Sequence, residues 1–208
     1  MDRTKTKAAS RRWFDRRAER YERGLDSGWL KRVQREALAA LELGSHDQLL
    51  DVGCGPGAAL VDAAGVVRSA YGIDLSPEMI GKALDATRGF EHVDVCVADS
   101  ERLPFGDAAF TAVLCSTSFH HYPDPQHAVR EMARVLAPGG RLVVGDACSD
   151  LVAARVADVF LRRFEPGHVH LHRSAEIAAF VQRAGLTGVR MRRISSGAYA
   201  IVHGTRPA

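Results

Sequence analysis

The chain has 208 residues, of which 46% are hydrophobic and 25% are charged, and its formal net charge is +3. This length and balance are typical of a globular protein with one main domain. No apolar run approaches the 18 residues of a membrane span, and the Arg-rich start lacks the apolar stretch of a signal peptide. We therefore expect no membrane span and a cytoplasmic location.

The cysteine pattern favours a reducing compartment. The cysteines occur singly, without a C-x-x-C pair, at Cys54, Cys96, Cys115 and Cys148. Each falls on or beside a predicted strand, so we expect small buried side chains and not disulfides or metal ligands.

The N-terminal segment is strongly basic. Residues 1–35 contain twelve Lys or Arg and five Asp or Glu, which gives this segment a net charge of +7. Such a segment can attract nucleic acid, anionic lipid or an acidic substrate. Charge runs usually mark the solvated face of a helix, however, and we expect no nucleic-acid partner.

Apolar residues in the same segment recur at helical spacing. Trp13, Phe14, Ala18 and Tyr21 fall near one face of a helix within residues 11–23. This pattern favours an amphipathic helix that packs on the rest of the protein.

A predicted strand leads into a glycine-rich turn at residues 49–57, Leu-Leu-Asp-Val-Gly-Cys-Gly-Pro-Gly. Dinucleotide-binding folds use such a turn to hold a pyrophosphate, and the spacing of Gly53 and Gly55 alone fits that pattern. Asp51 would repel a phosphate, however, and Pro56 removes one N–H group from the turn. The acid favours instead a ligand that carries an ammonium group and hydroxyls.

Two more acids follow the next predicted strands. Asp74 comes 23 residues after Asp51, just before a helix that Ser76 and Pro77 begin, and Asp99 closes a third strand. The carboxyl ends of parallel strands meet at one edge, where open α/β sheets bind ligands. Asp74 can accept two ribose hydroxyls and Asp99 the exocyclic amine of adenine, so an adenosine fits this edge.

The second half of the chain continues as alternating strands and helices. We expect strands at residues 110–116, 141–146, 189–194 and 199–203, and helices at residues 125–136, 151–164 and 174–184. Pro138, Gly139 and Gly140 should stop the first of these helices, and Ser174 should cap the last. The last two strands predict a terminal hairpin. The predicted fold class is α/β, with a seven-stranded mixed sheet that is mostly parallel and has an antiparallel last strand.

Three histidines occupy alternate positions, at His168, His170 and His172, and would lie on one side of any extended segment. Imidazoles in this arrangement can bind zinc, copper or nickel. Glu165 is the one nearby acid that could complete such a set, so we predict no metal site here. We expect this segment to line a ligand pocket together with the helix before it.

At this point the chain resembles a known family. Its motifs follow, in order and at the family's intervals, those of class I S-adenosylmethionine-dependent methyltransferases, at residues 49–57, 72–80, 98–105, 120–121 and 134–140. The branch that it resembles is the small-molecule group that includes the ubiquinone and menaquinone biosynthesis C-methyltransferases. The resemblance implies a Rossmann-like fold with helices on both faces of the sheet, and S-adenosyl-L-methionine as cofactor.

The resemblance also implies which positions contact the cofactor. They are Asp51, Gly53, Cys54 and Gly55 for the methionine part, Asp74 for the ribose, Leu75 and Met79 for the adenine faces, Asp99 and Ser100 for the adenine edge, and Ser116 and Tyr21 beside them. One departure from the family is Thr111, which stands where an Asp is usual and should change only a local hydrogen bond.

In this family an N-terminal segment covers the cofactor. The resemblance therefore divides the chain into a basic helical lid, residues 1–44, and a methyltransferase domain, residues 45–208. Tyr21 and Trp29 are the candidate lid residues.

Catalysis in such an enzyme requires few side chains, because the methyl group of a sulfonium is already a good electrophile. A base would help if the acceptor is a phenol, a hydroxyl or an acidic carbon. His121 is the first candidate and His120 the second, since both follow the fourth strand. The alternative is that these histidines only shape the loop through hydrogen bonds.

The acceptor pocket should be partly apolar. Phe119, Phe160 and Phe164 are expected to line it, which suits a small aromatic or lipophilic methyl acceptor. Two alternatives remain open: an NAD-dependent oxidoreductase, which the bare glycine pattern predicts, and a noncatalytic nucleotide-binding module whose basic segment contacts RNA.

Overall fold

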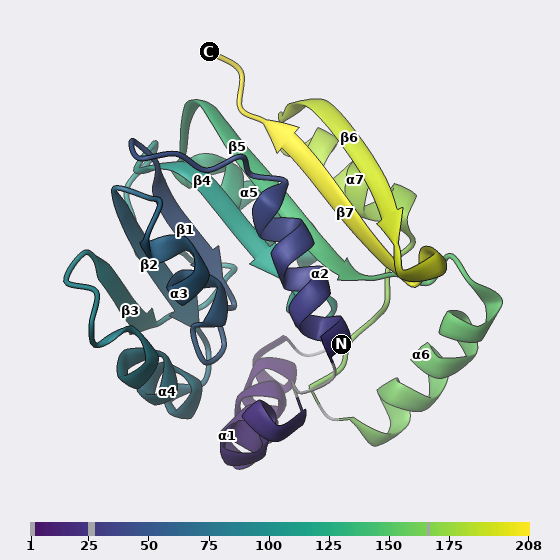
Figure 1. Ribbon diagram of the computed structural model, residues 1–208. Coiled ribbons are helices and arrows are strands. Elements are labelled where there is room, and N and C mark those ends of the chain that lie inside the picture. Colours follow the sequence, from purple (N-terminus) through teal and green to yellow (C-terminus); the bar gives the residue numbers. More distant parts are fainter. Residues whose placement is uncertain (1–2, 25–27, 166) are drawn as a thin grey trace.

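The apolar runs of the sequence form the strands of one sheet (Figure 1). The computed structural model describes residues 3–24, 28–165 and 167–208. The strands are β1 (Gln48–Val52), β2 (Ser69–Asp74), β3 (Val93–Val97), β4 (Phe110–Ser116), β5 (Leu136–Ala147), β6 (Thr187–Ile194) and β7 (Tyr199–Thr205). Their order is β3-β2-β1-β4-β5-β7-β6, and β7 is antiparallel to both neighbours while β1 to β5 run parallel. The predicted mixed sheet is confirmed.

Helices cover both faces of this sheet, as the resemblance implied. They are α1 (Arg3–Gly24), α2 (Gly28–Ala39), α3 (Ala58–Ala64), α4 (Pro77–Thr87), α5 (Pro125–Val135), α6 (Val152–Phe164) and α7 (Ser174–Arg183), with short turns of 3-10 helix at η1 (Phe119–His121) and η2 (Ser195–Gly197). Successive strand residues point to opposite faces, so Leu49 belongs to the core layer that includes α2 and α3, while Leu50 belongs to the layer that includes α5 and α7. The sheet therefore separates two layers of apolar core.

Several element boundaries differ from the sequence prediction, and those around α5 and α7 have a clear physical reason. Helix α5 ends at Val135, and β5 begins at once with Leu136, five residues before the predicted start at Arg141. Pro138 favours extended backbone before it, and Leu136 pairs with Phe110 ahead of a register shift. Ser174 is the first helical residue of α7 and not its cap, because its hydroxyl donates to Asp150.

The cysteine expectation was right at three positions and wrong at Cys96. Cys54, Cys115 and Cys148 are buried, whereas Cys96 is exposed. Cys96 lies on β3, an edge strand whose side chains are mostly open to solvent. No helix among the described residues has both the length and the apolar character needed to cross a bilayer.

Thr111 makes a local hydrogen-bond network where the family usually has an acid. Its hydroxyl donates to Asp47 Oδ1 at 2.6 Å and accepts the backbone N–H of Gln48 at 3.0 Å. The second oxygen of Asp47 accepts from Arg141 at 2.7 Å. These bonds hold the amino ends of β1, β4 and β5 together, at the edge opposite the predicted ligand site.

Close packing of α2 on β5 generates a stability prediction. A Cβ atom on Gly145 would lie 2.7 Å from Ala37 Cβ, and an alanine side chain cannot rotate away. We expect Gly145→Ala to lower the free energy of unfolding by about 1–3 kcal/mol through overpacking, measured by urea titration. Gly81→Ala is the matched control: Gly81 is an exposed residue of α4 with open space around it, and the change should stabilise by about 0.5–1 kcal/mol. Equal stabilities of the two variants would contradict this prediction.

Candidate active site

The glycine-rich turn after β1 is fastened to the end of β2. The backbone N–H groups of Gly53 and Cys54 both donate to the Ile73 carbonyl, at 2.8 and 2.9 Å. Gly53 has φ +78°, and a Cβ there would lie 2.5 Å from the Ser118 hydroxyl oxygen. Only glycine combines this backbone conformation with such a close approach. The turn thereby opens a space at the carboxyl ends of the strands.

Asp74 holds the turn and the next helix in place. Its Oδ2 accepts the N–H of Gly55 at 3.1 Å, and its Oδ1 accepts the N–H of Ser76 at 2.8 Å. Burial raises the pKa of Asp74, although these hydrogen bonds oppose the shift. Ser76 caps α4 as predicted, because its hydroxyl accepts the N–H of Met79.

Asp51 is a buried carboxylate with no hydrogen bond from any residue that the structure describes. Its exposed fraction is 3%. Burial raises the pKa of Asp51 to about 7, and the negative charge of Asp74 contributes to the shift. Such a group is stabilised by a cationic partner that enters from the site.

The residues that the motifs predicted come together around one cavity, which has about 1000 Å³ of empty space including its mouth. The predicted residues at its wall are Asp51, Gly53, Cys54, Gly55, Asp74, Leu75, Met79, Asp99, Ser100, Ser116 and His121. His120 lies behind His121 and is not at the wall. The side chains of Tyr21 and Trp29 lie outside the part of the chain that the structure describes.

Helix α1 contributes cavity residues that the sequence analysis missed. Lys7, Ser10 and Phe14 line the cavity from this helix, which lies beyond the carboxyl ends of the parallel strands (Figure 1). Lys7 Nζ lies 2.7 Å from Asp99 Oδ2 and 2.7 Å from Glu101 Oε2. Lys7, Ser10 and Phe14 are spaced by three and four residues, which is typical of one helix face. The sequence analysis did not use this signal, because the predicted helix began only at residue 11.

His121 faces the cavity from η1. Its Nδ1 lies 2.6 Å from the carbonyl oxygen of Gly167. A carbonyl oxygen only accepts, so Nδ1 carries the proton and Nε2 of the neutral ring keeps a lone pair. Burial lowers the pKa of His121 well below 6.5, and positive charge on His120 and His168 lowers it further. His121 is therefore neutral at pH 7.

His120 supports its neighbour from behind. Its Nδ1 lies 2.8 Å from Asp146 Oδ1, and its backbone N–H donates to Asp146 Oδ2 at 2.9 Å. Burial by itself lowers the pKa of His120, but the Asp146 carboxylate more than offsets this effect, so the pKa is raised. The ring centroids of His120 and His121 are 3.9 Å apart. The pKa is thus raised for His120 and lowered for His121.

The segment after α6 is bound to these histidines through its backbone. The N–H groups of Val169 and His170 both donate to the His120 carbonyl at 3.1 Å. Asp158, which is 4% exposed, accepts the N–H of Leu171 at 2.8 Å and lies 2.7 Å from His168 Nε2. This buried carboxylate therefore organises a segment that has no regular secondary structure.

Three aromatic residues expected at the pocket lie elsewhere. Phe160 and Phe164 on α6 are 61% and 74% exposed, and Phe119, the first residue of η1, is buried in the core. The helical periodicity of α6 was correct, but its apolar stripe faces solvent among the described residues. Phe14 lies at the cavity wall instead. Its ring is edge-on to the His121 ring, and the two ring centroids are 4.8 Å apart.

Comparison with known proteins places this site in a family. A model described as a methyltransferase domain matches residues 50–144. The chain is 33% identical over 220 aligned positions to the demethylmenaquinone methyltransferase of Mycolicibacterium vanbaalenii. The alignment covers 93% of this chain and 92% of that relative. The chain belongs to the class I S-adenosylmethionine-dependent methyltransferases. It is an enzyme of the branch that includes the demethylmenaquinone methyltransferases, and its cofactor is S-adenosylmethionine.

Other proteins that are similar to this methyltransferase in sequence or in fold have different named activities. It is 40% identical over 112 positions to the 27-O-demethylrifamycin SV methyltransferase of Amycolatopsis mediterranei, covering 51% of this chain and 40% of that protein. The S-adenosylmethionine-dependent methyltransferase SibL has the same fold, with a TM-score of 0.75, 22% identity and coverage of 91% and 59%. So does the [4+2]-cyclase SpnF, with a TM-score of 0.72, 21% identity and coverage of 85% and 81%. The fold alone therefore does not define the reaction.

Family membership sets aside the two alternatives from the sequence, an NAD-dependent oxidoreductase and a noncatalytic module. The cavity itself fits the cofactor of the methyltransferases. The unpaired carboxylate of Asp51 and the hydroxyl of Ser116, which is buried without a partner among the described residues, both lie at its wall. A ligand with an ammonium group and several hydroxyls satisfies such groups.

The raised pKa of Asp51 predicts how cofactor affinity depends on pH. An ammonium group favours the ionised carboxylate, so binding of S-adenosylhomocysteine to a carboxyl that is still protonated must release a proton. Affinity should therefore rise between pH 6 and pH 7, where the amino group of the ligand stays protonated. Calorimetry in buffers of different ionisation enthalpy measures the released proton directly.

The control for this prediction is Asp51→Asn, which keeps the shape of the side chain and cannot ionise. It should bind more weakly and release no proton. Proton release that is the same in this variant and in the wild type would assign the titration to another group.

Proposed function

We propose that this methyltransferase acts on a small aromatic acceptor, of the quinol or phenol class, and that His121 removes the proton from the atom that is methylated. The observation that carries the proposal is the neutral imidazole of His121 at the cavity wall, with Nδ1 held by Gly167 and Nε2 free to accept. Similarity to demethylmenaquinone methyltransferase over nearly the whole chain supports the class of acceptor.

The cofactor side of the site follows from the buried acids. We assign Asp51 to the ammonium group of the methionine part and Asp74 to the ribose hydroxyls, for which each carboxylate oxygen retains a lone pair. The remaining assignments are Gly53, Cys54, Gly55 and Ser116 around the methionine part, Leu75 and Met79 at the adenine faces, Asp99 and Ser100 at the adenine edge, and Tyr21 in the cover. Bound in this way, the cofactor supplies a methyl group on a positively charged sulfur.

The acid–base properties of His121 favour an acidic acceptor. A base whose pKa is well below 6.5 is fully available at pH 7, but it abstracts a proton efficiently only from a group of modest pKa. Phenols, quinols and activated carbons meet this condition better than aliphatic alcohols do. His120, paired with Asp146, holds the position and the charge of its neighbour.

Helix α1 fits the role of a cover over the reaction. Ion pairs join it to the site at Lys7–Asp99 and Lys7–Glu101, and the Ser76 hydroxyl donates to Asp15 at 2.6 Å. Phe14 adds an apolar edge beside His121, which suits a flat aromatic acceptor. Within residues 1–44 we assign α1 to the lid, because Val33 and Ala37 of α2 belong to the core.

Methyl transfer from labelled S-adenosylmethionine tests the proposal. The panel is a prenylated 1,4-naphthohydroquinone, a catechol, an aliphatic alcohol and an alkylamine. We expect transfer to the first two, and transfer confined to the amine would contradict the acceptor class.

The role of His121 is tested with the acceptor that this panel identifies. His121→Ala should lower kcat by about 100-fold or more, the usual contribution of a general base. Its affinity for S-adenosylhomocysteine should stay within about 3-fold of the wild-type value, because the change removes no cofactor contact. Free imidazole should restore part of the rate. His127→Ala is the control, since His127 is an exposed histidine of α5. Unchanged kcat in His121→Ala would return this residue to a role in shaping the loop.

A further inference from the structure

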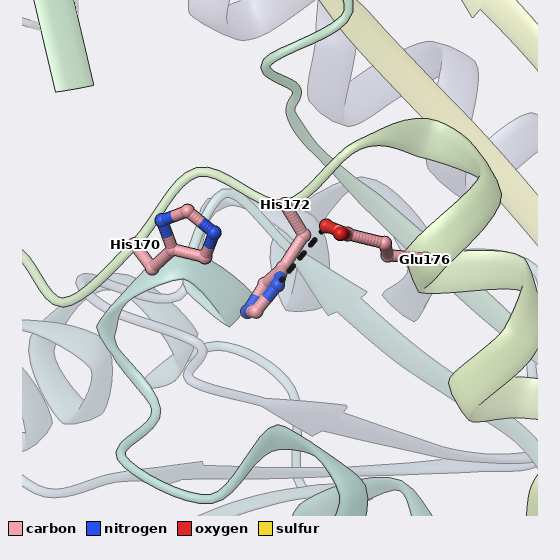
Figure 2. Close-up of side chains that lie close together, drawn as sticks. All are labelled: His170, His172 and Glu176. Carbon is pink, nitrogen blue, oxygen red and sulfur yellow. Dashed lines mark ion pairs between the residues drawn. The ribbon is translucent and has the colours of Figure 1, made fainter. Parts of the chain in front are cut away.

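We propose that His170, His172 and Glu176 bind one divalent transition-metal ion of the zinc class, at a site separate from the cofactor cavity. Each residue offers one ligand atom, and the three atoms lie within 4.8 Å of one another. Figure 2 shows the His172 ring between His170 and the Glu176 carboxylate. Ligand atoms around one zinc ion lie about 2.0–2.2 Å from the metal, so small side-chain rotations complete the set.

The acid in this cluster comes from the helix after the histidines. His170 and His172 are alternate residues of an extended segment, and Glu176 lies on the first turn of α7. The Glu176 carboxylate is turned back toward the segment, because its Oε2 accepts the N–H of Arg173 at 2.8 Å. The sequence analysis considered Glu165 and not Glu176. The spacing of the residues did not show that the first turn of α7 places the Glu176 carboxylate beside the histidines.

The pairing of His172 with Glu176 leaves room for an ion. His172 Nδ1 lies 3.7 Å from Glu176 Oε2, beyond hydrogen-bond length. An ion held by both groups, with the His170 ring beside them, satisfies the nitrogen lone pair and the carboxylate together. None of the three residues lines the cofactor cavity.

A second carboxylate orients the first ligand. His170 Nδ1 lies 3.0 Å from Asp158 Oδ2, which leaves Nε2 of this ring for the ion. Metal-binding histidines commonly donate their other N–H to a carboxylate in this way. Arg162 Nη2 pairs with the same carboxylate oxygen and also contacts His170 Nδ1, so Asp158 and Arg162 both lie on the Nδ1 side of this ring and their charges balance.

Exposure and ligand type indicate which ion fits. The side chains of His170 and Glu176 are 37% and 50% exposed, so ions and water ligands have access from one side. Two imidazoles and one carboxylate suit zinc and related transition metals, whereas calcium and magnesium prefer oxygen ligands alone.

Metal binding here would fasten the segment that supports the candidate base. The backbone of this segment donates to the His120 carbonyl, and its Gly167 carbonyl accepts from His121. An ion would join the segment to α7 and thereby restrict the loop of η1. The site itself does not depend on the proposed acceptor or on catalysis.

Zinc titration of tag-free, chelator-treated full-length protein tests the site. Calorimetry should give one ion per chain, and zinc should raise the melting temperature. His170→Ala and Glu176→Gln should each weaken zinc affinity by about 10-fold or more. Both residues are partly exposed, so these variants should fold. Cobalt should bind with the visible absorption of a low-coordinate site, and His170→Ala should lose that absorption.

His127→Ala is the matched control and should bind zinc as the wild type does. Binding of much less than one ion per chain would overturn the proposal. So would equal zinc affinity in His170→Ala and His127→Ala.

Discussion

Burial of two carboxylates at the ends of β1 and β2 governs the architecture of this site. A buried charge is costly unless hydrogen bonds or an opposite charge compensate it. Asp74 is compensated by N–H groups of the glycine turn and of α4, so the same bonds that stabilise it also shape the cavity floor. Asp51 receives no such bond from the described residues, so its buried negative charge is not compensated and its pKa is raised. The core on both faces of β1 holds it there, and a cationic ligand removes the penalty.

The elements around the cofactor could be predicted because their signals are local. Apolar runs predicted the strands, and the acids that follow the first three strands were expected to meet at one edge of the sheet. Contacts between distant segments carried no comparable signal. Lys7 reaches Asp99 across 92 residues, and the helical periodicity of α6 could not tell that Phe160 and Phe164 face solvent. Glu176 is a different case, because it lies only four residues after His172 and its contact depends on how α7 begins.

The adjacent histidines of η1 differ in the direction of their pKa shifts, although they lie on the same backbone turn. Asp146 attracts the proton to His120, and that charge, with burial, removes it from His121. The difference needs no change in residue type, because it comes from what each ring contacts: a carboxylate in one case and a carbonyl in the other. Because the pKa of His120 is raised and that of His121 is lowered, a proton binds His120 first and the lone pair of His121 stays available.

The sheet order divides the molecule at the pairing of β1 with β4. The groups that we assign to the methyl donor come mostly from the ends of β1, β2 and β3, and those that we assign to the acceptor, His121 and Phe14, come from η1 after β4 and from α1. The stretch after α6, residues 167–173, is held by the side chains of His121, Asp158 and Glu176 and by a few backbone bonds. Its side chains other than the buried His168 and Leu171 can be exchanged at little cost to the fold. In this arrangement the acceptor side of the site can change while the groups assigned to the methyl donor stay as they are.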